Sequence, residues 1–168
     1  MIRPALLLVS ALAVLTACSP GNHGALQPEA AADITLVSTG GLPNDTARLS
    51  SGGVTADVTG LWSDQGESVE IRYRSQTAAD VPIASGSTWN GQSAPATAAW
   101  DRSAPEPGNA LGRPLLGAGP LHLKPKATTI VQIEYDRQAS GLAIGDKVII
   151  LVPMPGGSRA VRFRVAGE

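Results

Sequence analysis

The stretch VEIRYR, residues 69–74, decides the fold, because apolar and charged residues alternate along it without a break. Successive side chains of a β-strand point to opposite faces of the sheet, so this period of two predicts one buried face and one solvated face. The apolar members are expected in the core: Val69, Ile71 and Tyr73. The charged members are expected to face solvent: Glu70, Arg72 and Arg74. Such half-buried strands are typical of antiparallel sheets.

The same alternation recurs in VTADV (54–58), VQIEY (131–135) and VRFRV (161–165), which predicts three further strands. KVIILV (147–152) is instead a continuous apolar run, and we expect a central strand covered on both faces. Turn-forming residues separate these stretches, and no segment shows a helical period. The chain holds 19 Gly, 13 Pro and 4% aromatic residues, which also favours a loop-rich β protein. We therefore predict an all-β fold, an antiparallel β-sandwich of about seven strands over residues 33–168.

A long stretch at residues 86–119 interrupts this pattern, because it consists largely of Ser, Ala, Pro and Gly and shows little periodicity. A loop of this length within a compact domain is usually functional or disordered. It contains two of the three tryptophans, Trp89 and Trp100, whereas disordered segments are poor in aromatic residues. We expect part of this loop to pack on the sandwich, and we expect the third tryptophan, Trp62, in the core.

The N-terminus carries one basic residue, Arg3, followed by eleven apolar or small residues at 5–15. A helix of that length spans about 17 Å, which is too short for the roughly 30 Å hydrocarbon core of a bilayer. The segment fits the hydrophobic region of a signal peptide, and it lacks the polar face of a helix that packs on a core. We expect residues 1–17 to be a cleaved leader.

The end of this leader, LTAC at residues 15–18, resembles the lipobox of bacterial lipoproteins. The resemblance implies that Cys18 carries diacylglycerol, becomes the first mature residue and anchors the protein in a membrane through two or more acyl chains. Ser19, rather than an aspartate, follows the cysteine, which implies the outer membrane and a protein that faces the periplasm. Residues 18–32 are small, polar and punctuated by Pro and Gly, so we expect a flexible tether in which His23 is solvated.

The last part of the chain contains LHLKPKATTIVQIEY, LAIGDKVIILV and GGSRAVRFRV. This layout resembles the closing strands of immunoglobulin-like accessory domains in bacterial envelope proteins, which implies an immunoglobulin-like sandwich. It is also similar to the periplasmic copper-chaperone family over residues 123–125, 145–148 and 161–165. The His and Met copper ligands of that family have no counterparts here beyond the isolated His122 and Met154. The resemblance therefore implies no copper delivery.

Few residues offer catalytic or metal chemistry. The single cysteine excludes internal disulfides and cysteine-based zinc sites, and a net charge of -1 argues against nucleic-acid binding. No G-x-S-x-G motif occurs, and His122 lies between Leu121 and Leu123, where alternation points it away from the core. Clusters of ligands that would predict a zinc, copper or calcium site are missing. We expect no cofactor and no metal.

Carboxylates and arginines alternate outward on the predicted strands. The carboxylates are Asp57, Glu70, Glu134 and Asp136, and the arginines are Arg72, Arg74, Arg162 and Arg164. Two carboxylates suffice for glycoside hydrolysis, but the sequence does not fix the distances between them, and cross-strand ion pairs are the simpler explanation. If the strands that carry the arginines are neighbours, the arginines form a basic stripe suited to an acidic partner or an anionic glycan.

Trp89, Trp100 and the four arginines are the candidate partner-binding residues, because exposed tryptophans act as anchors at interfaces and on sugars. We expect a non-enzymatic, lipid-anchored lipoprotein of the cell envelope that binds another envelope component or supports its assembly. The alternative is a periplasmic protein that binds a small ligand, a metal or a glycan at the loop end. A hydrolase is the third hypothesis.

Overall fold

The structure, a computed structural model, describes residues 23–39, 45–63, 66–89, 91–104, 108–136 and 142–167. The described residues form fourteen β-strands and no helix, which confirms the all-β prediction. The expected leader and Cys18 lie outside the described residues. Within the described part of the chain, no helix is long and apolar enough to span a membrane.

The first seven strands are β1 (His23–Pro28), β2 (Ile34–Val37), β3 (Thr46–Ser51), β4 (Val54–Ser63), β5 (Gly66–Ser75), β6 (Ala79–Val81) and β7 (Gly86–Trp89). The remaining strands are β8 (Gln92–Pro95), β9 (Ala98–Asp101), β10 (Arg113–Pro114), β11 (Leu121–Leu123), β12 (Thr128–Asp136), β13 (Lys147–Met154) and β14 (Gly157–Val165).

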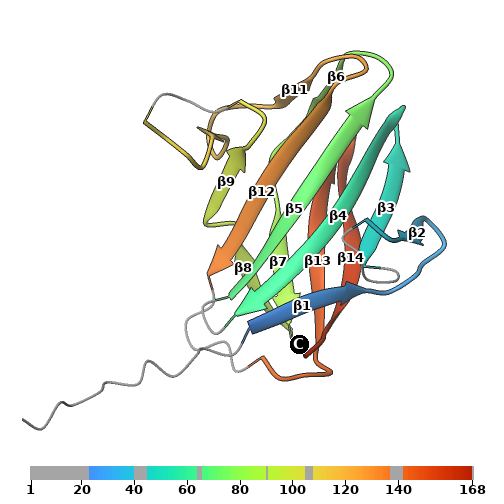
Figure 1. The fold of residues 1–168 in the computed structure, drawn as a ribbon, viewed down its shortest axis with the longest axis vertical. Coiled ribbons are helices and arrows are strands. Elements are labelled where there is room, and N and C mark those ends of the chain that lie inside the picture. Colours follow the sequence, from blue (N-terminus) through green and yellow to red (C-terminus); the bar gives the residue numbers. More distant parts are fainter. Residues whose placement is uncertain are drawn as a thin grey trace, which may run out of the picture.

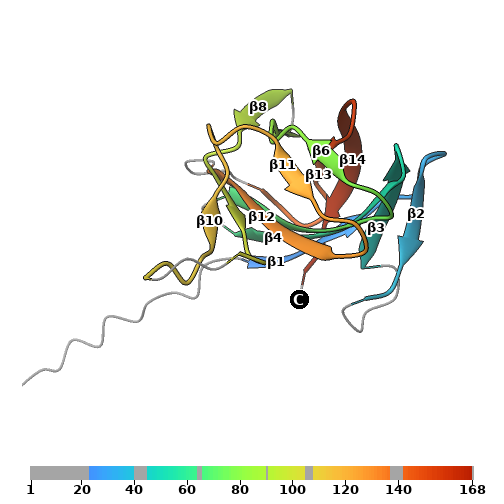
Figure 2. The ribbon, with the colours of Figure 1, turned by 90° about the horizontal axis from the view of Figure 1, so that it is seen from above.

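The strands form two packed layers, seen face-on in Figure 1 and from above in Figure 2. The front layer is β9, β12, β5, β4, β3 and β2, and the back layer is β14, β13, β7 and β8. All pairs are antiparallel, as the alternation predicts, and the longest is β4 with β5. A second small sheet of β6 and β11 lies at the upper end of Figure 1, where Val81, Leu121 and Leu123 are buried. We call the opposite end, where β1 starts and β14 finishes, the lower end.

One edge of the sandwich is bridged by β1, which pairs with both layers. Residues 23–26 pair with β4, and residues 26–28 pair with β14. Leu26 lies in the core, opposite Gly60. A Cβ at position 60 would lie only 3.0 Å from the Leu26 side chain, so this close approach requires glycine. The interpretation of residues 18–32 as a flexible tether is therefore wrong for residues 23–28. The composition of residues 23–28 resembles that of a linker. The segment is nevertheless ordered, because Leu26 is buried and the backbone pairs with strands of both layers.

The other edge is bridged by the stretch predicted as a long loop. In it, β8 pairs with β7 of the back layer and β9 pairs with β12 of the front layer, and only Ala96 and Thr97 separate the two strands. The continuous sheet therefore curls, with β10 at one end of its strand order and β8 at the other, and the short connection from β8 to β9 links the two layers. The loop prediction for residues 86–119 is wrong where these strands lie. The inward residues there are alanines, Ala94 and Ala99, which give little hydrophobic signal.

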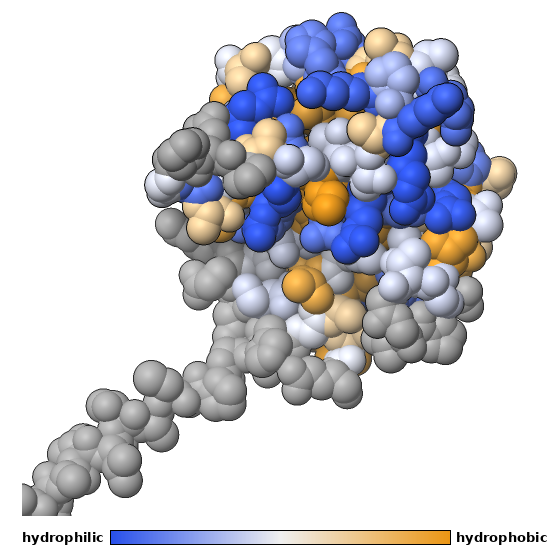
Figure 3. Space-filling view, turned by 45° about the horizontal axis from the view of Figure 1, so that its top comes forward, coloured by the Kyte–Doolittle hydropathy of each residue, from blue (hydrophilic) through white to orange (hydrophobic). Residues whose placement is uncertain are grey.

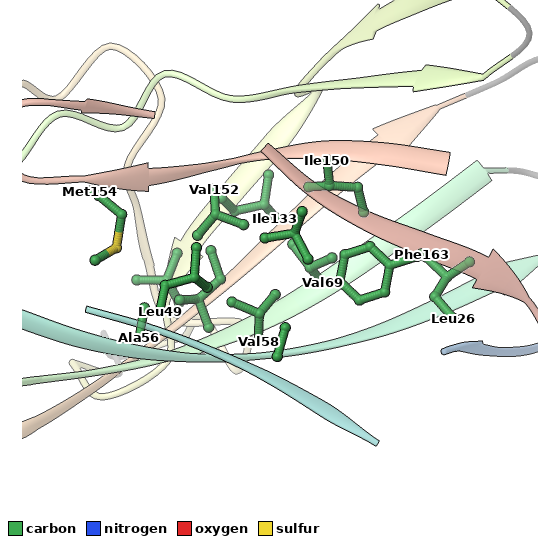
Figure 4. Packing of buried hydrophobic residues seen from close by; sticks show 14 of the residues in the cluster. Leu26, Leu49, Ala56, Val58, Val69, Ile133, Ile150, Val152, Met154 and Phe163 are labelled. Atoms are coloured by element: carbon green, nitrogen blue, oxygen red, sulfur yellow. The ribbon is translucent and has the colours of Figure 1, made fainter. Parts of the chain in front are cut away.

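The core lies between the layers, as Figure 4 shows for side chains of both. Val58, Val69 and Ile133 of the front layer face Ile150, Val152 and Phe163 of the back layer. The strand β13 is central, between β14 and β7, as its sequence predicts, but it is not covered on both faces. Leu151 is 41% exposed, because no further described element packs on the outer side of the back layer. Trp62 is buried, as predicted. The immunoglobulin-like layout of this sandwich stays a prediction.

Candidate functional site

The outer side of the front layer gathers more of the predicted binding residues than any other described surface. Strand register sets them in rows: Gln132 lies opposite Trp100 and Glu70, and Arg72 lies opposite Ile130 and Asp57. Figure 3 shows hydrophilic side chains gathered on this side of the molecule, with isolated hydrophobic ones between them. We call this surface the polar face. Its members are Arg48, Asp57, Glu70, Arg72, Arg74, Trp100, Arg102, Gln132 and Glu134.

Asp57 is the buried carboxylate of the polar face, and two arginines bind it. Its side chain is only 3% exposed, although β4 points it outward, because arginines from the strands on both sides cover it. Arg48 of β3 donates two hydrogen bonds to it, of 2.6 and 2.8 Å, and Arg74 of β5 donates a third of 2.9 Å. The hydrogen bonds from Arg48 hold the pKa of Asp57 below its usual range, against the opposing effect of burial. Asp57 is therefore a permanent acceptor that fixes two guanidinium groups.

Arg72 lies on the same face but is held differently. Its Nε donates to Glu70 on its own strand at 2.8 Å, and about half of its side chain is exposed. The described residues offer its two terminal nitrogens no hydrogen-bond partner. Such a planar pair of donors matches a carboxylate or phosphate group.

Arg72 also lines a hollow between β1, β3, β4 and β5, with a volume of about 510 Å³. Polar groups on its walls include Gln27, Thr46, Asp57 and Thr59. Apolar or small residues also line it, among them Ala25, Leu61, Ala166 and Gly167. A cavity of this size with convergent polar groups is suited to a small ligand or to one residue of a larger partner.

The two predicted tryptophans have different positions. Trp100 is half-buried on the polar face, opposite Gln132 and Pro114. Trp89 is half-buried against the core, and its Nε1 donates to Asp146 at 3.1 Å. Asp146 also accepts the backbone N–H of Ala143 at 2.9 Å, so Trp89 fastens the loop that precedes β13. Trp100 is available to a partner on the polar face, whereas Trp89 contributes to the packing of the lower end.

The four predicted arginines do not form one stripe. Arg72 and Arg74 lie on β5, whereas Arg162 and Arg164 lie on β14, and β4 and β1 separate those two strands in the sheet. Arg164 pairs with Glu29 at 3.2 Å, and Arg162 is exposed on the back layer. The expected cross-strand pairing holds for Arg74 with Asp57, while Glu70 pairs along its own strand with Arg72.

The other carboxylates and the second histidine do not form a cleft. Glu134 accepts from Gln132 at 3.1 Å on the open polar face, and the Asp136 side chain lies outside the described residues, as does that of His23. His122 points away from the core, as predicted, and its Nδ1 lies 2.6 Å from Asp80 on the small sheet. Among the described residues, no three His, Cys, Asp or Glu side chains gather where they could hold a metal ion.

Hydroxyl groups inside the sandwich serve its packing. Ser85 hydrogen-bonds to Tyr135 and donates to the carbonyl of Leu151 at 2.5 Å, and Tyr73 donates to the carbonyl of Pro153 at 2.7 Å. Burial raises the pKa of Tyr135 to about 12 and raises the pKa of Tyr73 further. Both phenols therefore stay protonated at neutral pH. They tie the two layers together.

Sequence reasoning missed Arg48 and the hollow. Arg48 lies in TARLSS, where it alternates with the buried Ala47 and Leu49, so the period of two carries the signal for its outward position. The hollow has no such signal, because β1 forms one of its walls only after it joins both layers.

Comparisons of the chain with models of protein families, with curated protein sequences and with solved structures find no match.

Proposed function

We propose that this protein is a non-enzymatic, lipid-anchored lipoprotein of the cell envelope, and that its polar face binds an anionic group of another envelope component. The proposal rests on the LTAC lipobox at residues 15–18 and on one structural observation, the placement of Arg72. Arg72 lines the hollow next to the Arg48–Asp57–Arg74 cluster, and the described residues offer its terminal nitrogens no hydrogen-bond partner. Trp100 lies on the same face, two strands away on β9, and arginine and tryptophan are both enriched among the residues that anchor interfaces.

The anchor is tested with Cys18→Ser in the full chain. Loss of the thiol removes the acceptor for diacylglycerol, so we expect an uncleaved precursor and no lipid mass on the protein. Intact-mass spectrometry of the membrane and soluble fractions measures both. Normal cleavage and membrane attachment of the variant would contradict the lipobox.

The polar face is tested with the double variant Arg72→Gln, Trp100→Ala against the matched control Arg162→Gln, which removes an exposed arginine from the back layer. We expect mild crosslinking in the native envelope to trap a partner with the wild type and the control. The double variant is expected to lose most of that product. A partner that is retained by the double variant, or lost equally by the control, would contradict this assignment.

The hollow favours a second candidate function, the binding of a small ligand or glycan. Its volume of about 510 Å³ accommodates a sugar or a comparable molecule. A thermal-shift screen with acidic oligosaccharides and small carboxylates tests it, and Thr59→Phe, which fills the hollow, should abolish any rise in the melting temperature. No shift with the wild type would exclude this candidate.

A further inference from the structure

Two large apolar side chains stand in solvent at the lower end of the sandwich. Leu61 is 62% exposed and Ile144 is 72% exposed, the highest values among large hydrophobic residues in the described part of the chain. Single exposed leucines are common on protein surfaces, but exposed apolar residues that gather in one place mark a contact surface.

These two side chains belong to one continuous surface. Leu61 lies opposite Ala25 of β1, and the Ala25 carbonyl accepts the N–H of Ala166 at 3.0 Å. Gly167 follows, and a Cβ on it would lie 3.0 Å from Cδ1 of Ile144. We call this surface the lower-end strip; its members are Ala25, Leu61, Ile144, Ala166 and Gly167.

The strip lies beside the start of β1, whose first residue, His23, follows Cys18 by five positions in the sequence. Because β1 begins at His23, only residues 19–22 separate the lipidation site from the folded domain. Five residue steps of fully extended chain span at most about 17 Å, whereas a tether to residue 32 would span about 50 Å. Ala25, opposite Leu61, is only two residues beyond His23. The order of β1 therefore shortens the tether and brings the lower end to the lipid surface.

We propose that the lower-end strip rests on the bilayer in which Cys18 is anchored, with Leu61 and Ile144 in its headgroup region. This inference rests on the proposed lipidation and adds a fixed orientation to it. Apolar side chains partition into the interface of a bilayer, and nearby cations are attracted to anionic headgroups. Lys147 and Arg164 lie beside the strip, opposite each other on β13 and β14, and share the single carboxylate of Glu29. Asp146, which directly precedes Lys147, balances the remaining charge, so the apolar side chains rather than a net charge carry the proposed contact.

This orientation has a consequence for the polar face. The strands of the front layer run from the lower end to the upper end, so the face rises away from the membrane and the small sheet of β6 and β11 is its most distant part. A partner reaches Trp100 from the side, parallel to the bilayer, whereas the hollow that Arg72 lines shares Ala25, Leu61, Ala166 and Gly167 with the strip and lies next to the headgroups.

The test uses the full, lipidated chain, purified from membranes and reconstituted in vesicles of phosphatidylethanolamine and phosphatidylglycerol. Cysteine is introduced at Leu61, at Ile144, or at the control position Leu151, an exposed leucine on the back layer, and is labelled with an environment-sensitive fluorophore. Lipidation consumes the thiol of Cys18, the only native cysteine, so the label is specific. We expect a quencher attached to the lipid chains to reduce the fluorescence at positions 61 and 144 at least threefold more than at 151.

Each outcome decides the proposal. Equal quenching at all three positions, on protein that carries the lipid mass and floats with the vesicles, would overturn the docking and leave the anchor intact. Absence of the lipid mass, or failure to float, would overturn the anchor and with it the docking. A further variant, Leu61→Asp with Ile144 labelled, should lower the quenching at 144, whereas Leu151→Asp should not change it.

Discussion

Two acid–base contacts of equal length lie at different places in the molecule. Arg48 and Asp57 approach to 2.6 Å on the polar face, where the carboxylate is 3% exposed. His122 and Asp80 approach to 2.6 Å on the small sheet, where the two side chains are 73% and 63% exposed. The distance is the same, but the first carboxylate receives three hydrogen bonds from two arginines, and the second contact stands in solvent.

The difference shows that burial and the number of donors, rather than distance, decide what such a contact contributes. Exposed pairs typically stabilise a fold by less than about 1 kcal/mol, because water and salt screen them. A buried carboxylate that loses its partners costs several times more, because its charge stays desolvated. The asymmetry within the Asp57 cluster matters too: the carboxylate is buried, whereas Arg48 and Arg74 are 39% and 50% exposed.

The largest effect is expected when both cations are removed and the buried charge is left behind. Arg48→Met with Arg74→Met should lower the free energy of unfolding by about 2–3 kcal/mol at pH 7, since Asp57 then keeps none of its three hydrogen bonds. Urea unfolding measures this, with Arg162→Met as the control for loss of an exposed arginine. A double variant as stable as the control would show that Asp57 needs no partner.

A smaller effect is expected when the carboxylate itself is neutralised. Asp57→Asn leaves two half-exposed arginines that water can hydrate, so the loss should be about 1 kcal/mol at pH 7. Because the pKa of Asp57 is lowered in the folded state, its contribution is fully present above the unfolded pKa of about 3.9 and is lost as pH falls through the folded value.

The stability of Asp57→Asn should consequently depend less on pH than that of the wild type below about pH 4. Unfolding curves of both proteins between pH 2 and 7 measure the difference. If the free energy of unfolding of both proteins falls equally with decreasing pH, carboxylates other than Asp57 cause the loss of stability in acid.

The smallest effect is expected at the exposed contact. His122→Gln should change the free energy of unfolding by less than about 0.5 kcal/mol in 0.15 M salt, because both partners are largely solvated. The same urea measurement applies. A loss above 1 kcal/mol would mean that the small sheet depends on this pair, and the contrast with Asp57 would fail.

The strongly alternating strands could be predicted from the sequence, and the two bridging segments could not. In VEIRYR and VQIEY every residue assigned to the core is buried. Large apolar side chains at every second position specify which face of a strand is buried, because a shift by one residue would expose all of them. The segment at β1 offers only Leu26 and Pro28 as inward residues, and the segment at β8 and β9 offers mainly alanines. Their order comes from backbone hydrogen bonds to both layers, which no local pattern encodes.

The candidate site was predictable in part for a similar reason. Alternation places Arg72 and Arg74 outward, but strand order decides that Arg162 and Arg164 lie on the other layer. The burial of Asp57 depends on the register that sets Arg48 on one side and Arg74 on the other. Neither order nor register follows from the composition of a single strand.

The sequence by itself determined the all-β class and the inward and outward residues of the long strands, because each depends on neighbours in the chain. Only the tertiary structure decided that β1 joins the sandwich, that Asp57 is covered, and that Leu61 and Ile144 meet beside the start of the fold. Those features depend on segments far apart in sequence that become neighbours when the sheet curls.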